Sequence, residues 1–166
     1  MPTKKTLYEA HLHPKSKIYQ TAVIAASVKH LEMAEDSFIG DFCFISVPML
    51  ILDKGAQVNS GTRILGQSYV CIGEYATVGY GCTLLTSSDT PRGKYMNDAA
   101  PLRLRQILHG PITIGERAFV GSHSVLMPNS YVPEGTVLRA FSYLDRVLGE
   151  RDAVYGGQPS KLIKSR

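Results

Sequence analysis

Three side chains in the second half of the sequence are of types that can accept a proton during catalysis: Asp89, His109 and His123. Histidine is the usual general base because its unperturbed pKa lies near neutral pH. His109 stands before Gly110-Pro111, and His123 occupies a position that we expect to face outward. An isolated outward-facing histidine is ordinarily a surface residue, and His123 gains a role only if its surface becomes an interface. The sequence leaves open which of the three is the base.

Other familiar catalytic arrangements are missing from the sequence. There is no Gly-x-Ser-x-Gly motif to indicate a serine nucleophile. The cysteines, Cys43, Cys71 and Cys82, are odd in number and lack the spacing of a metal site, so we expect reduced thiols in the core. We therefore expect no metal.

The elements that must position these residues follow a six-residue period between residues 112 and 145. Large apolar residues recur at Ile114, Val120, Leu126, Val132, Leu138 and Leu144, and the fourth residue after each of the first five is Ala118, Ser124, Ser130, Thr136 or Ser142. A period of six fits neither a helix nor an ordinary strand, so the chain must turn a corner every six residues. Three hexads then close a triangular coil, and coils stack about 4.8 Å apart. The pattern predicts an all-β parallel solenoid with large residues inside and small ones near the corners.

The same rule holds from Met33 to Leu84 with two small register breaks, and it stops between residues 85 and 111. An interruption of this length in a compact domain indicates a functional excursion loop. We expect a single domain with a cap and irregular first coil at 1–32, coils at 33–84, the excursion loop at 85–111, further coils at 112–145, and a tail at 146–166 that contains a short helix starting near Pro159.

Composition limits the partners. The 166 residues carry 18 basic and 14 acidic side chains, a formal charge of +4, without a nucleic-acid motif. A small polyanion fits this mild excess better than nucleic acid does. No run of 18 apolar residues indicates a membrane span, and residues 1–17 are too polar for a signal peptide, so we expect a soluble, cytoplasmic protein.

The hexads, the Ser87-Ser88-Asp89 loop and the tail Gly157-Gln158-Pro159-Ser160-Lys161 resemble the hexapeptide-repeat acyltransferases, in the branch that acts on sugars. The tail is similar to the family's Gly-x-Pro-Ala-Lys/Arg ending, with Ser160 in place of alanine. The resemblance covers the chain from about Met33 onward. It implies a left-handed β-helix, which physical principles alone would not favour, and a homotrimer with sites between neighbouring subunits.

The resemblance also implies a reaction, in which acetyl-CoA donates its acetyl group directly to a hydroxyl or amine of a sugar or nucleotide-linked sugar. The histidine that the commonest branch carries early in the loop is replaced here by Ser87 or Ser88, so the base is not carried over. The implied sugar-binding residues are Ser88, Asp89 and Asn97, although Asn97 is equally suited to a turn. Those implied for coenzyme A are Gly121, Ser122, Ala140 and Ser142 near the pantetheine, and Arg146, Pro159, Lys161 and Arg166 near the phosphates.

Two other functions remain open from the sequence. A solenoid without activity that serves as a binding or scaffold protein would explain the missing loop histidine. A metal-dependent hydratase such as a γ-class carbonic anhydrase needs three zinc-binding histidines, whereas only His109 and His123 lie in the regular region after the loop. The acceptor, the length of the acyl chain and the choice between O- and N-acylation are not encoded in any pattern that we can identify.

Overall fold

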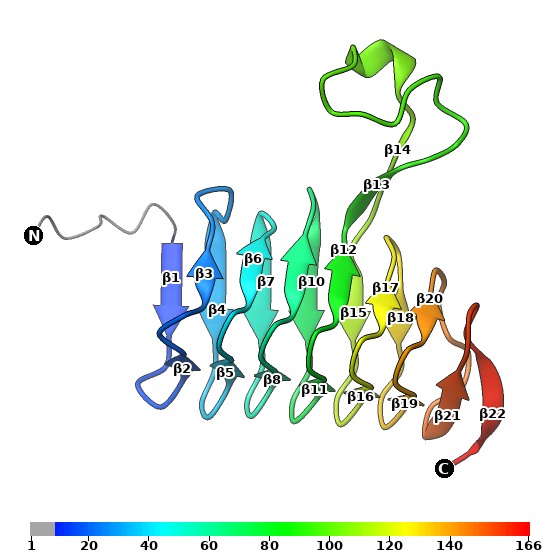
Figure 1. Cartoon of the computed structure of the whole chain (residues 1–166). Helices are drawn as coiled ribbons and strands as arrows, with labels where there is room; N and C mark the ends of the chain where they lie inside the picture. The colour runs from blue at the N-terminus through cyan, green and yellow to red at the C-terminus, as the bar shows by residue number, and fades with distance from the viewer. Residues whose placement is uncertain (1–8) are drawn as a thin grey trace, which may run out of the picture.

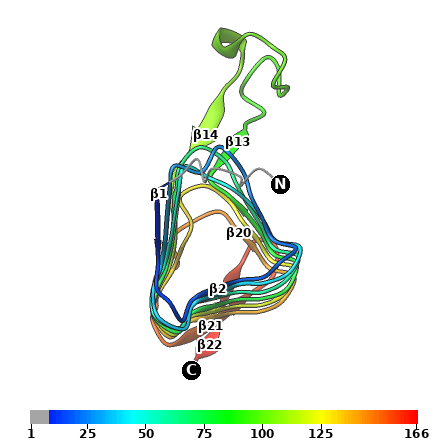
Figure 2. The same ribbon diagram turned by 90° about the vertical axis from the view of Figure 1, so that its left-hand side faces the viewer.

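The computed structural model describes residues 9–166 and consists of parallel coils stacked into a triangular prism (Figures 1 and 2). The expected cap at 1–32 lies partly outside the described residues, because it includes residues 1–8. Each coil contributes one short strand to each of three walls, and nearly all neighbouring strands in a wall pair in parallel. Together these features confirm the predicted fold class, a left-handed parallel β-helix.

The three walls, named A, B and C, are built as follows. Wall A contains β1 (Glu9–Leu12), β4 (His30–Met33), β7 (Met49–Leu52), β10 (Tyr69–Ile72), β15 (Ile112–Ile114) and β18 (Tyr131–Val132). Wall B contains β2 (Lys17–Ile18), β5 (Phe38–Ile39), β8 (Gln57–Val58), β11 (Thr77–Val78), β16 (Phe119–Val120), β19 (Val137–Leu138), β21 (Ala153–Gly156) and β22 (Lys161–Ser165). Wall C contains β3 (Val23–Ile24), β6 (Phe44–Ser46), β9 (Arg63–Leu65), β12 (Thr83–Leu85), β17 (Val125–Leu126) and β20 (Tyr143–Leu144).

The hexad rule accounts for the core. The six large residues that open the hexads from Ile114 to Leu144 are at most 1% exposed, and the five small residues that follow them are at most 2% exposed. Because the interior is narrow at each corner, a small hydroxyl fits there and bonds to a backbone carbonyl. Ser124, for example, donates to the Gly121 carbonyl at 2.7 Å. The core is therefore a column of stacked aliphatic side chains with hydrogen-bonded hydroxyls along its edges.

Within residues 9–166 one long excursion interrupts the regular winding, at the corner between walls C and A. There the antiparallel strands β13 (Ser87–Asp89) and β14 (Ile107–His109) carry the chain away from the prism and back, with one 3₁₀ turn, η1 (Leu102–Leu104), at the far end. Figure 2 shows this excursion projecting from one vertex of the triangle. The excursion is the feature that breaks an otherwise uniform surface.

The prediction of a short helix near Pro159 is wrong. Residues Lys161–Ser165 form β22, which pairs antiparallel with β21 and closes the edge of wall B. A five-residue segment gains little from helix formation because nucleation is costly, whereas pairing satisfies the open strand edge that the last coil would expose. In the described part of the chain, no helix is long and apolar enough to cross a membrane.

Candidate active site

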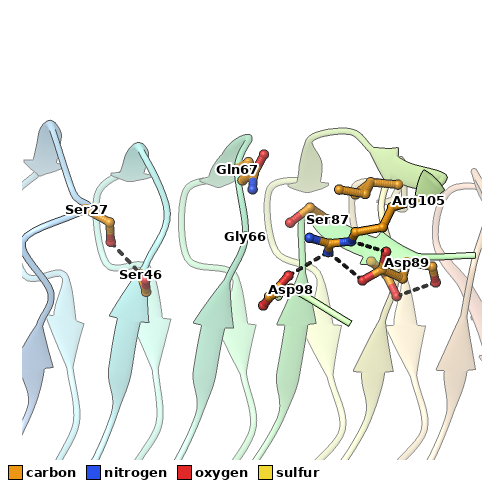
Figure 3. Close-up of a pocket in the computed structure, with 10 residues that line it drawn as sticks. Ser27, Ser46, Gly66, Gln67, Ser87, Asp89, Asp98 and Arg105 are labelled. Carbon is orange, nitrogen blue, oxygen red and sulfur yellow. Dashed lines mark hydrogen bonds and ion pairs between the residues drawn. The ribbon is translucent and has the colours of Figure 1, made fainter. Parts of the chain in front are cut away.

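A cavity of about 390 Å³ opens where the excursion leaves the prism (Figure 3). It lies along the corner between walls C and A and beneath the hairpin formed by β13 and β14. Its lining is mostly polar and comes from Ser27, Ser46, Gly66, Gln67, Ser87, Ser88, Asp89, Asp98, Arg105 and Ile107. The cavity therefore has the size of a ligand site and a lining of hydroxyl, amide and carboxylate groups.

Successive coils build the floor of this cavity. Ser27 and Ser46 occupy neighbouring coils at the corner, with their hydroxyl oxygens 2.8 Å apart. Gly66 follows with φ +123°, and a Cβ there would lie 2.5 Å from both the Ser87 amide nitrogen and the Thr86 hydroxyl. Only glycine tolerates this conformation and this approach. The coil spacing thus aligns short polar side chains from segments about 20 residues apart in sequence.

Arg105 organises the roof of the cavity. Its Nε and Nη2 donate to the two carboxylate oxygens of Asp89 at 2.9 and 2.7 Å, and Nη2 also donates to Asp98 Oδ1 at 2.6 Å. The Arg105 side chain is only 9% exposed and that of Asp89 is 19% exposed, whereas that of Asp98 is 97% exposed. One guanidinium therefore holds Asp89 of β13, in the bidentate geometry that arginine favours, and also Asp98 of the following loop.

The charges in this cluster have a clear electrostatic consequence. The hydrogen bonds from Arg105 lower the pKa of the Asp89 carboxyl below its ordinary value, and Asp89 in turn raises the pKa of Arg105. Asp89 is therefore ionised at neutral pH, and both of its oxygens already accept hydrogen bonds. It is better suited to binding and orientation than to taking a proton.

The other residues predicted in the excursion differ in whether they line the cavity. Ser88 is half-buried in the cavity wall, and its hydroxyl donates to the Asp89 carbonyl at 3.2 Å. Asn97 does not line the cavity; its side-chain oxygen accepts a hydrogen bond from the Ala99 amide at 2.8 Å, as in a turn. His109 is exposed and pairs opposite Ser87 in the hairpin, which places both side chains on the same face. His109 thus borders the cavity without lining it.

His123 lies at a different corner, between walls B and C. It adopts φ 60°, its ring sits over Gly81, and it stacks on Phe141 with 5.2 Å between ring centroids. The side chain is exposed, as the hexad pattern predicts. Within one chain the structure therefore separates His123 from Asp89 and His109.

The residues implied for pantetheine gather at this same corner between walls B and C. Gly121 and Ser122 lie directly beneath Ala140 of the next coil, and a Cβ on Gly121 would fall 2.2 Å from the Ala140 amide nitrogen. Ser142 is buried, and its hydroxyl donates to the Arg139 carbonyl at 2.6 Å. Close coil stacking thus explains Gly121, and the accessible groups at this corner come from Ser122 and Ala140.

The residues implied for phosphate binding do not converge within one chain. Arg146 is exposed and bonds to the adjacent Asp145, whereas the Arg166 guanidinium donates to the Gly135 carbonyl at 2.9 Å. Lys161 begins β22, directly after the exposed Pro159 and the buried Ser160. These positively charged groups lie on separate parts of the last coils.

The cavity also contains residues that the sequence did not single out: Ser27, Ser46, Gly66, Gln67, Asp98, Arg105 and Ile107. The sequence did carry one signal for Arg105, since an arginine in an excursion that also holds two aspartates is a natural partner for them. The corner residues carry no such signal, because nothing in the hexad pattern distinguishes Ser27 from an ordinary corner serine.

No protein-family model matches the chain, but individual proteins do. The dTDP-4-amino-4,6-dideoxy-D-glucose acyltransferase of Escherichia coli is 28% identical over 131 residues, which cover 77% of this chain and 68% of that protein. Among solved structures, the N-acyltransferase AntD from Bacillus cereus, in complex with dTDP and 3-hydroxybutyryl-CoA, superposes with a TM-score of 0.84 at 20% identity, covering 98% of this chain and 86% of AntD. A hexapeptide transferase family protein from Anaplasma phagocytophilum gives a TM-score of 0.63 at 18% identity, covering 96% of this chain and 85% of that one.

The solved structures show the fold, and the curated relative adds similarity in sequence. Together with the hexads and the stacked-coil prism, these matches show that the chain shares its fold with a hexapeptide transferase family protein and is similar in sequence to an acyltransferase.

Proposed function

We propose that this protein transfers an acyl group from an acyl-CoA thioester to the amino group of a nucleotide-linked amino sugar. The observation that carries the proposal is the carboxylate- and hydroxyl-lined cavity beneath the excursion, in a chain related to an acyltransferase that acts on a dTDP-linked amino sugar. AntD, which shares the fold, is an N-acyltransferase whose structure contains dTDP and an acyl-CoA.

The cavity suits an amino sugar better than a purely hydroxylated one. Hydroxyls of Ser27, Ser46 and Ser87 and the amide of Gln67 can pair with sugar hydroxyls along the floor. Asp89 and Asp98 present negative charge from the roof. A positively polarised amine is favoured next to these carboxylates, and a hydroxyl gains less from them.

In the proposed reaction the neutral amine attacks the thioester carbonyl, forming a C–N bond, and the C–S bond then breaks to release coenzyme A as its thiol. The nitrogen must lose one proton, and we assign its acceptance to Asp98, which then gives it to the departing sulfur. This side chain is exposed, and only its Oδ1 bonds to Arg105. Asp89, held by both of its oxygens, orients the acceptor. A sugar amine needs no strong base, because a fraction is unprotonated at neutral pH.

The donor requires a second subunit in this proposal. Ser122, Ala140 and His123 lie at the corner between walls B and C, whereas the acceptor cavity lies at the corner between walls C and A. A homotrimer of side-by-side prisms would bring these two corners together, with acetyl-CoA or another short acyl-CoA between them. We place the reaction in the cytoplasm, where both substrates are made.

The assignment can be tested by following release of the coenzyme A thiol with acetyl-CoA and dTDP-4-amino-4,6-dideoxyglucose, with dTDP-glucose as the hydroxyl-only control. We expect turnover with the amino sugar alone. Asp98→Asn should lower kcat by about a hundredfold, whereas Asp53→Asn, which removes an exposed carboxylate elsewhere, should leave it unchanged. Equal turnover of both sugars would refute the choice of acceptor, and full activity of Asp98→Asn would refute the role of Asp98.

A further inference from the structure

A second cluster of reactive side chains lies on the outward face of wall A, at the N-terminal end of the prism. Strands β1 and β4 pair in parallel, with Glu9 opposite His30 and His11 opposite Glu32. The alternation of a strand directs all four side chains to the same face. None of them lines either the cavity of the candidate active site or the neighbouring cavity formed by Thr90, Pro91, Arg92, Gln106, Ile107 and Leu108.

Three of these residues are arranged like the ligands of a divalent cation. His11 Nε2 lies 2.9 Å from Glu9 Oε1, His30 Nδ1 lies 3.6 Å from Glu9 Oε2, and one ligand atom from each residue falls within 4.8 Å of the others. Zinc binds nitrogen and oxygen ligands at about 2.0 to 2.2 Å. The exposed side chains of Glu9 and His11 need only small rotations to converge on one ion.

Glu32 completes the arrangement from behind His30. Its Oε2 lies 3.5 Å from His30 Nε2, on the side of the ring opposite to Nδ1. A carboxylate that accepts a hydrogen bond from one ring nitrogen fixes the tautomer and leaves the lone pair of the other nitrogen free for a metal. Zinc-binding histidines in proteins are typically supported in this way.

We propose that Glu9, His11 and His30 form a surface site for zinc or a similar borderline divalent cation, with Glu32 orienting His30. Two histidines and one carboxylate are a ligand set that zinc uses, and water would fill the remaining position because the site is exposed. The sequence did not predict a metal, because the ligands come from two strands whose residues lie about 20 positions apart and have no recognisable spacing.

The site has a mechanical consequence for the solenoid. Among residues 9–166, β1 is the terminal strand of wall A and pairs with β4 alone. A cation shared by β1 and β4 ties the terminal strand to the next coil and stabilises the folded chain in proportion to its occupancy. This role does not depend on the acyltransferase reaction.

Titration of untagged, metal-free protein with zinc alone, by calorimetry, tests the proposal. We expect one saturable zinc per chain, with affinity lowered tenfold or more in His11→Asn and His30→Asn. Glu32→Gln should lower affinity by about tenfold, as loss of a supporting carboxylate does. The matched control is His13→Asn, since His13 lies in the turn just after β1 and its Nδ1 accepts the Lys15 amide.

Two results would overturn the proposal: no saturable binding to the parent protein, or affinity unchanged in His30→Asn. The second result would mean that the cluster is only a set of histidine–carboxylate ion pairs. Thermal melts without zinc check that each variant folds. In the same melts, zinc should raise the Tm of the parent protein and of His13→Asn but not that of His30→Asn.

Discussion

Among the described glycines, Gly121 is the one at which an added Cβ would come nearest to backbone atoms, so Gly121→Ala should disrupt the prism there. An added Cβ would lie 2.2 Å from the Ala140 amide nitrogen, 2.5 Å from the Arg139 carbonyl carbon and 2.7 Å from the Ala140 Cα. All three are backbone atoms of the next coil and cannot rotate away. The two coils would have to separate locally by about 1 Å to restore ordinary contact, which would strain their ladder of hydrogen bonds.

Overpacking of this kind costs about 3 kcal/mol, the upper part of the usual range, because no flexible side chain can absorb the clash. In a domain of this size each kcal/mol shifts Tm by about 2 to 4 °C, so we expect a loss of about 6 to 12 °C. Differential scanning calorimetry measures this directly. Acetyl-CoA binding measured below the transition would show whether the same corner is also needed for the donor.

The matched control is Gly149→Ala, because a Cβ at Gly149 would meet nothing within 4 Å. Its Tm should stay within about 2 °C of the parent value. If Gly121→Ala melted as close to the parent as this control does, the argument that backbone proximity dictates glycine at this corner would be refuted.

Three further predictions concern charge and burial. Arg105→Met removes the hydrogen bonds that lower the pKa of Asp89, so kcat/KM should fall by tenfold or more and the acid limb of its pH profile should move to higher pH. Arg103→Met, which removes an exposed arginine two residues away, should change neither. An unmoved acid limb in Arg105→Met would exclude the effect of Arg105 on Asp89. Two lysines lower the pKa of Glu35 to about 2, so its stabilising contribution is complete above about pH 4.5 and is lost as pH falls towards 2. Glu35→Gln should therefore have a lower Tm than the parent at pH 6 and the same Tm near pH 2. A Tm difference that stays constant with pH would contradict this. Burial raises the pKa of the Cys82 thiol, so Ellman's reagent at pH 8 should react with it only after unfolding, and rapid reaction in the folded protein would show that the core is open.

The fold could be predicted because every hexad of a solenoid core follows the same short-range sequence pattern. Ile114, Val120 and Leu126 fall on successive walls of one coil, and each pairs with its equivalent eighteen residues further along the chain. A single rule of large and small residues therefore determines both the strand and its partner. The tail has no such repeat. Residues Lys161–Ser165 form a strand because they pair with the open edge of β21, and this tertiary contact has no signal in the sequence.

The candidate site could be predicted only in part. Ser88 and Asp89 stand at the point where the period ends, so the sequence marks them. Ser27 and Gln67 reach the same cavity only because coils stack at the corner, and Arg105 and Asp98 only because the excursion folds back on itself. Such contacts depend on loop conformation, for which the sequence has no periodic signal.

Use of an acyl-CoA donor is the central claim, and calorimetric titration of the purified protein with acetyl-CoA and with coenzyme A, at two salt concentrations, tests it most directly. We predict saturable binding of both that weakens at the higher salt, because salt screens the attraction that we expect between the phosphates of coenzyme A and exposed arginine and lysine side chains. No binding of either to a protein shown to be folded and oligomeric would contradict the account and would favour a solenoid that serves as a scaffold.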